Sequence, residues 1–154
     1  MTPKNITYIS GNQGLLDEIQ PLWEGLNRHH ETVSPHFKDN FAAFTFAERK
    51  RRLLVKYLHE DLRIDLAICD DRPVGYIISG ASEDGTGEIE SVYIEEDYRG
   101  MNVGDELMRQ ALGWLDKREV HSKVIDVAVG NESAYKFYAR YGFFPRVTRL
   151  KQRK

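Results

Sequence analysis

The residue types with the clearest chemical meaning lie in residues 88–107, which read as a strand, an acidic turn and the start of a helix. The first N–H groups of a helix have no intrahelical partner and carry the positive end of the helix dipole. Arg99 adds positive charge, Gly100 and Gly104 leave room for close approach, and Asn102 tolerates a left-handed bend. The segment therefore predicts a phosphate site, although a plain glycine turn between a strand and a helix would use the same residues.

Two widespread phosphate loops do not fit this segment. A P-loop needs Gly-Lys followed by Ser or Thr, and the dinucleotide fingerprint needs three glycines at G-x-G-x-x-G spacing. Residues 99–104 read Arg-Gly-Met-Asn-Val-Gly and contain neither pattern. A nucleotide phosphotransferase is therefore disfavoured.

Strands and helices that would position this loop follow from the hydrophobic patterns along the chain. Alternation or short apolar runs predict strands, and apolar residues at helical spacing predict helices. An Asp-Gly pair at 84–85 predicts a hairpin turn, and the strand, helix and strand after it predict a parallel pair. Strands are expected at 6–9, 62–69, 74–79, 88–94, 123–129 and 143–150; helices are expected at 15–26, 47–58, 103–115 and 132–141.

Composition restricts the protein to a few classes. The chain has 154 residues, 41% of them hydrophobic and 30% charged, which suits one globular domain over residues 1–154. Its net charge of −2 argues against a general nucleic-acid binder. Residues 1–4 lack the pattern of a signal peptide and no run is long enough for a membrane span, so we expect a cytoplasmic protein without a membrane partner.

Candidate metal ligands and thiols are few. The single cysteine, Cys69, lies in a strand pattern, where a small buried side chain is the favoured interpretation and a nucleophile is the alternative. His29 and His30 are adjacent and would point in different directions on a helix, and His36 follows in a polar stretch. No metal site is expected, because metal ligands need rigid and convergent spacing.

Residues 99–104 resemble the acetyl coenzyme A loop of the GNAT superfamily, the GCN5-related N-acetyltransferases. That loop has Arg or Gln, two variable residues, Gly, one variable residue, then Gly or Ala; Asn102 stands where the family usually has glycine. A second family signature is similar to residues 131–143, with Asn131, Ala134, Tyr138 and a Gly-Phe pair in order. The resemblance implies an α/β (α+β) GNAT fold, a mixed and mostly antiparallel sheet flanked by helices in the order β-α-α-β-β-β-α-β-α-β.

The resemblance also implies transfer of an acetyl group from acetyl-CoA to an amine by direct attack, without a metal. Glu88 and Glu90 share one face of a strand, where the family keeps a carboxylate that takes the proton directly or through water. Tyr138 matches the tyrosine near the sulfur. Residues implied to hold acetyl-CoA are Val92, Tyr93, Ile94, Arg99, Gly100, Met101, Asn102, Val103, Gly104, Asp105, Asn131 and Tyr138.

The acceptor amine stays open at the level of sequence. Acidic residues at 83–84, 88, 90 and 95–96 slightly favour a small cationic amine over a protein amine. In the family, the region between the first two helices, here residues 29–36, commonly lines the acceptor pocket; the aromatic stretch 37–46 could be a loop that packs on the core or a lid on an acceptor site. A homodimer is possible, and the rival interpretation is an acyl-CoA-binding or sensing module without turnover, which Asn102 keeps open.

Overall fold

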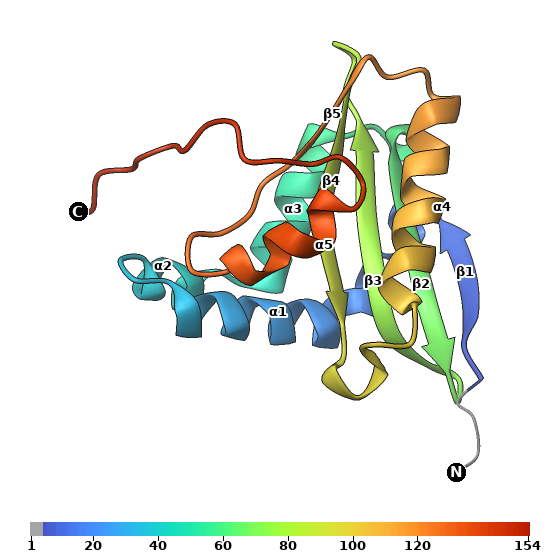
Figure 1. Ribbon diagram of the computed structural model, residues 1–154, viewed down its shortest axis with the longest axis horizontal. Helices are drawn as coiled ribbons and strands as arrows, with labels where there is room; N and C mark the ends of the chain where they lie inside the picture. The colour runs from blue at the N-terminus through green and yellow to red at the C-terminus, as the bar shows by residue number, and fades with distance from the viewer. Residues whose placement is uncertain (1–4) are drawn as a thin grey trace.

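The computed structural model describes residues 5–154 and contains a five-stranded sheet in the order β1-β2-β3-β4-β5 (Figure 1). The expectation about residues 1–4 lies outside the described part. Neighbouring strands from β1 to β4 run antiparallel, and β5 runs parallel to β4, as expected. The strands are β1 Thr7–Gly11, β2 Leu62–Cys69, β3 Arg72–Ala81, β4 Thr86–Ile94 and β5 Ser122–Ile125.

Two tight turns set the register of the antiparallel strands. Asp70 and Asp71 both have positive φ, 51° and 61°, which suits the short turn from β2 to β3. In the turn from β3 to β4, the Asp84 carboxylate accepts a hydrogen bond from the Thr86 N–H, and Gly85 has a φ of 88°. The hairpin predicted at residues 84–85 is therefore confirmed.

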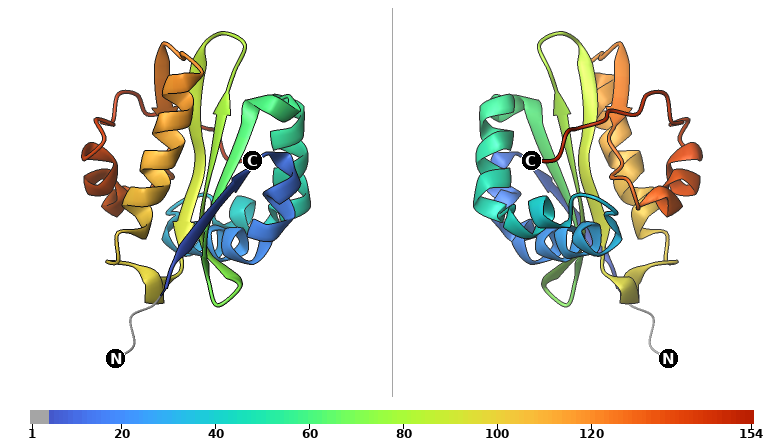
Figure 2. Two further views of the ribbon diagram at one scale, coloured as in Figure 1. Left: turned by 90° about the vertical axis from the view of Figure 1, so that its right-hand side faces the viewer. Right: turned by 90° about the vertical axis from the view of Figure 1, so that its left-hand side faces the viewer.

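Helices cover both faces of the sheet (Figure 2). One face carries α1 and α3 with the buried core of Leu16, Trp23 and Leu53; the other carries α4 with Leu107 and Met108. The first predicted helix begins in a 3-10 segment and extends to Val33, and a short helix forms in the aromatic stretch expected to be a loop or lid. The helical segments are η1 Gln13–Ile19, α1 Gln20–Val33, α2 Lys38–Ala43, α3 Phe46–Lys56, η2 His59–Asp61, η3 Glu96–Tyr98, α4 Val103–Lys117, η4 Glu132–Ala134 and α5 Tyr135–Ala139.

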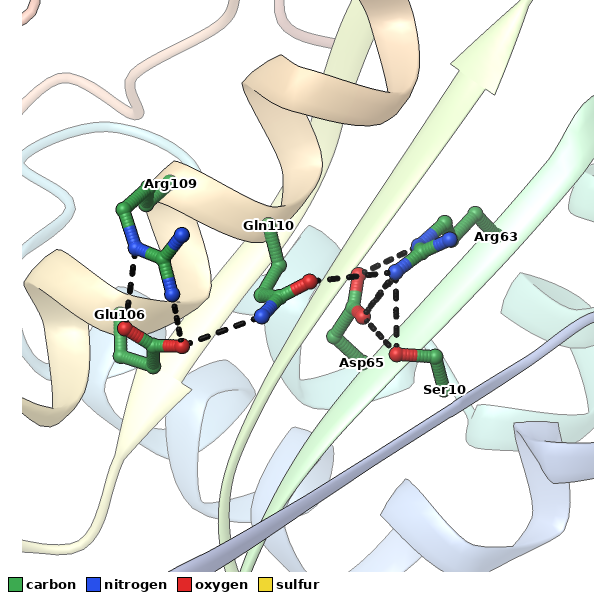
Figure 3. A network of polar contacts seen from close by, with 6 residues as sticks. All are labelled: Ser10, Arg63, Asp65, Glu106, Arg109 and Gln110. Carbon is green, nitrogen blue, oxygen red and sulfur yellow. Dashed lines mark hydrogen bonds and ion pairs between the residues drawn. The ribbon is translucent and has the colours of Figure 1, made fainter.

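A polar network joins β1 and β2 to α4 (Figure 3). Asp65 on β2 is 1% exposed and accepts hydrogen bonds from Arg63 at 2.9 Å and from the Ser10 hydroxyl at 2.5 Å. Arg63 also reaches Gln110 of α4 at 3.5 Å. A buried carboxylate is tolerated only when it is paired and hydrogen-bonded, and Asp65 meets both conditions.

The end of the chain differs from the sequence prediction. Residues 143–150, all of them described, form no strand, and Phe144, Val147 and Leu150 are 71%, 78% and 91% exposed. Pro145 removes one backbone donor from this segment, and a lone strand without a paired neighbour cannot satisfy its backbone groups. β5 also ends at Ile125 instead of reaching residue 129, and the predicted helix at 132–141 divides into η4 and α5.

No helix within residues 5–154 combines the length and the apolar character that crossing a bilayer requires.

Candidate active site

The parallel pairing of β4 with β5 stops partway along β4. The unpaired side of β4 beyond that point, from Glu90 to Ile94, is called the gap and marks the candidate site. Pairing with β5 runs from Thr86 opposite Ser122 to Ile89 opposite Ile125, and no further. After β5 the chain turns away toward α5 (Figure 1). The end of β4 around Val92 therefore keeps β3 on one side and has no strand partner on the other within residues 5–154. Backbone N–H and C=O groups along that edge can pair with an extended ligand.

β4 also bends where the gap opens. Ile78 of β3 lies opposite Ser91, and the next residue, Ser79, lies opposite Ile89, so Glu90 is an extra residue in β4. A bulge of this kind bends a strand, increases its twist and re-aims side chains, and it is common beside active sites. Here it places the second of the two predicted carboxylates at the start of the unpaired edge.

The predicted phosphate loop adopts the expected backbone. Asn102 has a φ of 62° and Gly100 a φ of 76°, and a Cβ built on Gly100 would meet nothing within 4 Å. Among residues 5–154 no side chain caps the first turn of α4, so its first N–H groups face the loop without a side-chain partner there. The loop borders a pocket of about 270 Å³ whose lining residues are Ile94, Tyr98, Arg99, Gly100, Asn102, Val103, Gly104, Asp105, Phe137 and Arg140.

Gly104 serves packing as well as access. A Cβ at this position would lie 3.0 Å from the Phe137 ring and 3.2 Å from Ile94, closer than side chains normally pack. The missing side chain therefore lets α4 approach β4 and α5 together. A larger residue here would push these elements apart or fill the pocket.

Two charged side chains that line the pocket, Arg99 and Asp105, already have partners within the protein. The Arg99 guanidinium donates from Nε to the Ile94 carbonyl at 2.9 Å and lies 5.5 Å from the centre of the Tyr93 ring. Asp105 accepts from the Tyr141 hydroxyl and forms an ion pair with Arg140 at 2.8 Å, and these hydrogen bonds hold the pKa of the carboxyl below its usual range. Asp105 thus ties α4 to the segment around α5 through its side chain. Its backbone N–H stays in the first turn of α4.

Glu90 is the more enclosed of the two predicted carboxylates, with a side chain 5% exposed. It accepts from Lys56 at 2.6 Å, from the Tyr57 hydroxyl at 2.5 Å and from Arg49 at 3.2 Å. Burial disfavours its charge, but the donors Lys56 and Tyr57 and the charge of Arg49 outweigh burial and lower its pKa. Glu90 is therefore held ionised.

Glu88 lies in a different setting two residues away. Its side chain is 19% exposed, and Lys56, at 2.9 Å, is its one hydrogen-bonding side-chain partner among the described residues. Burial raises its pKa, and the nearby negative charge of Glu90 adds to the rise, while Lys56 opposes it. The two carboxyl groups are thus separated in acidity, the pattern by which acids and bases are told apart in active sites.

Tyr138 lies in α5 and Asn131 in the turn before η4, on the segment that follows β5. Burial raises the pKa of Tyr138 to about 12, and no group in residues 5–154 hydrogen-bonds to its hydroxyl. The Asn131 amide oxygen lies 3.1 Å from His29 Nε2, which joins the turn before η4 to α1. Met101 lies on the loop surface, with a side chain 37% exposed.

Several residues around these positions carried no recognisable signal in the sequence. Arg49, Lys56 and Tyr57 come from α3 or its end and reach β4 across sequence separations of 41, 34 and 33 residues. Among the described residues no cluster of three or more His, Cys, Asp and Glu side chains is arranged to hold a metal.

The sheet, the half-open β4 edge and the loop at the start of α4 define a GNAT-type fold. The chain belongs to the acetyltransferase (GNAT) family, whose family model matches residues 19–143. A relative in Methanocaldococcus jannaschii, described as an uncharacterized N-acetyltransferase, is 31% identical over 78 residues. That match covers 47% of this chain and only 34% of the relative, so the chain spans far less than the relative's full length.

Solved structures share the fold at low sequence identity. An acetyltransferase of the GNAT family from Staphylococcus aureus has a TM-score of 0.69 at 16% identity, covering 90% of this chain and 84% of that one. A ribosomal-protein-alanine N-acetyltransferase from Brucella melitensis has a TM-score of 0.66 at 15% identity, covering 97% and 99%. An aminoglycoside N-acetyltransferase in complex with CoA has a TM-score of 0.64 at 16% identity, covering 99% and 97%.

Proposed function

We propose that this protein transfers an acetyl group from acetyl-CoA to a primary amine. The observation that carries the proposal is the edge of β4 left open between Glu90 and Ile94, beside an uncapped helix N-terminus with a glycine loop. Family membership and the CoA-bound relative support the same cosubstrate. Acetyl-CoA, when bound, supplies the acetyl group and the thiolate that leaves.

Cosubstrate binding is assigned to two adjoining regions. The N–H groups of Val103, Gly104 and Asp105, with Arg99 nearby, would hold the pyrophosphate, because they combine unpaired donors with positive charge. Gly100, Met101 and Asn102 shape that loop. The backbone of Val92, Tyr93 and Ile94 would pair with the pantetheine arm, and Asn131 and Tyr138 would contact it from the α5 side.

Glu88 is proposed as the group that takes the proton from the acceptor. An alkyl ammonium has a pKa near 10.4 and must lose a proton before its nitrogen can attack. A carboxylate with a raised pKa is a better base than one with a lowered pKa, and Glu88 has the raised value. Glu90, which accepts hydrogen bonds from Arg49 and Tyr57, would stay ionised and keep a negative charge beside Glu88.

Tyr138 is proposed to orient the leaving group. With a pKa raised to about 12, its phenol keeps its proton at neutral pH and can donate a hydrogen bond. Such a weak acid contributes more by placing the sulfur than by driving proton transfer.

A small cationic amine remains the favoured acceptor class over a protein amine. Glu88 and Glu90 are paired with two cations, Lys56 and Arg49, so this preference rests on the number of acidic residues in the sequence and not on a net negative charge at these two positions. The relatives named above include an aminoglycoside and a ribosomal-protein N-acetyltransferase, so the relatives do not favour one class. A cytoplasmic location also stays a prediction from sequence.

A direct test is an acetyl-transfer assay with a panel of amines, read as thiol release and as product mass. We expect turnover with at least one polyamine or aminosugar, and a loss of turnover in an Arg99→Ala, Gly104→Val variant. The rival proposal, a binding module without turnover, predicts acetyl-CoA binding with no acetylated product for any amine. On that rival proposal Tyr138→Phe would change nothing.

A homodimer is also proposed, and the exposed end of the chain supports it. Phe144, Val147 and Leu150 are exposed on an extended segment, while the outer edge of β5 has no strand partner within residues 5–154. Exposed apolar side chains and a free strand edge favour pairing with another copy. Light scattering of the full chain and of a chain ending at Phe143 tests this, since only the full chain should dimerise.

A further inference from the structure

Lys56 places an alkyl ammonium group between the two predicted carboxylates. It is the last residue of α3, and its Nζ lies 2.9 Å from Glu88 Oε1 and 2.6 Å from Glu90 Oε2. Its side chain is 43% exposed. A primary amine of the acceptor's own chemical class therefore lies against the proposed base.

Lys56 combines a structural role with a position beside the proposed base. Glu90 already receives hydrogen bonds from Arg49 and from the Tyr57 hydroxyl, which suffice to hold a buried carboxylate. Glu88 has no side-chain partner other than Lys56 within residues 5–154. The Lys56 side chain is 43% exposed, whereas the carboxylates it pairs with are 19% and 5% exposed, so Lys56 supports the structure and is also accessible.

We infer that Lys56 occupies the subsite for the acceptor ammonium and is itself an acetylation site of this protein. The inference rests on the proposed function. It adds a substrate within the chain, and it makes Lys56 an internal competitor for external amines.

The chemical step balances without a further reactant. Glu88 takes one proton from the Lys56 ammonium, which gives the neutral amine. A bond forms between Lys56 Nζ and the acetyl carbonyl carbon, and the bond from that carbon to sulfur breaks. The electron pair leaves with the sulfur, and the second proton lost by Nζ ends on the thiol.

Acetylation of Lys56 would change the charge of the site. The product amide has no positive charge, so both ion pairs of Lys56 are lost. Glu88 and Glu90 then have one cation fewer beside them, which favours binding of an external cationic amine.

The experiment follows acetylation of the full chain by peptide mass spectrometry after incubation with acetyl-CoA. We expect Lys56 to gain an acetyl group at a rate that is independent of protein concentration, because the reaction is intramolecular. Lys50 is the matched control, since it lies on the same helix in an ion pair with Asp17 at 2.7 Å and is 34% exposed. Glu88→Gln should slow the reaction at Lys56 by on the order of 100-fold and leave Lys50 unchanged.

A second readout needs no cosubstrate. The ion pairs with Glu90 and Glu88 raise the pKa of Lys56 against the effect of burial. An NMR titration of the lysine side chains should therefore show the Lys56 pKa falling in Glu88→Gln. An unchanged Lys56 pKa in that variant would remove the contact on which the inference depends.

The outcomes separate this inference from the proposed function. Acetylation of an added amine while Lys56 stays unmodified overturns the inference and leaves the function intact. Equal rates at Lys56 and Lys50 also overturn it, because they indicate uncatalysed acetylation. If the protein does not bind acetyl-CoA at all, both the inference and the proposed function are overturned.

Discussion

Two carboxylate clusters lie on either side of β3, and they differ in how completely they are satisfied. Asp65 on β2 is buried at 1% exposure and is closed in by Arg63 and Ser10 (Figure 3). Glu88 on β4 is partly exposed and has one hydrogen-bonding side-chain partner in the described part of the chain, Lys56, which is 43% exposed. The cluster around Asp65 is therefore closed and connects neighbouring elements, whereas the cluster around Glu88 is open. The number of donors around each carboxylate distinguishes the two clusters.

The largest expected effect is at the open cluster. Glu88→Gln removes the proposed base while keeping shape, so turnover with an amine should fall by on the order of 10²–10⁴-fold. Acetyl-CoA binding should stay unchanged. Steady-state kinetics check this, with Glu83→Gln in the exposed hairpin as the control. Normal turnover in Glu88→Gln would assign the proton to Glu90 or to water.

A substitution at Asp65, in the closed cluster, should lower the stability of the protein and leave its turnover unchanged. Asp65→Ala leaves the partly buried Arg63 without its partner, so the free energy of unfolding should fall by roughly 1–3 kcal/mol. Denaturant unfolding measures it. Asp17→Ala, which breaks an exposed ion pair with Lys50, should cost less than about 1 kcal/mol. Equal losses in the two variants would contradict the difference between a closed and an open carboxylate.

The pH dependence of stability should have opposite signs at the two neighbouring glutamates. Glu90 has a lowered folded pKa, so its contribution is present above the ordinary carboxyl pKa and is lost as pH falls through the folded value. Glu88 has a raised folded pKa, so its contribution is present below the ordinary pKa and is lost as pH rises through the folded value.

Melting temperatures of the two Gln variants across pH 3–7, a range chosen around the ordinary Glu pKa of about 4.3, test these signs. Glu90→Gln should weaken the loss of stability on acidification. Glu88→Gln should strengthen it. The same sign in both variants would mean that the donors around Glu90 do not set its acidity.

The smallest expected effect is at Tyr138. Tyr138→Phe removes one hydroxyl with no hydrogen-bond partner among residues 5–154, so stability should change little. Turnover should fall by about 10-fold or less, because the phenol orients the leaving group and supplies little driving force. Rapid-quench kinetics would detect the change in the chemical step. A loss as large as that of Glu88→Gln would make Tyr138 an essential acid.

Local patterns explain why much of the fold could be predicted. The strands β2 to β4, the hairpin turn at 84–85 and the helix α4 depend on alternation, turn residues and helical spacing within short windows. The left-handed backbone at Asn102 followed from its small polar side chain. These features need no information from distant parts of the chain.

Non-local contacts explain the errors and omissions. The segment 143–150 was predicted as a strand and is not one, because strand formation needs a paired edge that no local pattern reports. The donors around Glu90 lie more than 30 residues away, and His29 reaches Asn131 across 102 residues. The sequence therefore indicated both Glu88 and Glu90 as candidate bases. The difference between their pKa values depends on side chains from α3 and its end that contact β4.

The central claim is that acetyl-CoA binds in the gap beside β4 and at the start of α4. Calorimetric titration with acetyl-CoA tests it most directly, with Gly104→Val and Gly113→Val as a matched pair. Both glycines lie in α4, but a Cβ at Gly113 would meet nothing within 4 Å, whereas one at Gly104 would meet Phe137 and Ile94. Binding by the wild type and Gly113→Val, lost in Gly104→Val, is the predicted result. No binding by the wild type, or equal binding by all three proteins, would contradict the account.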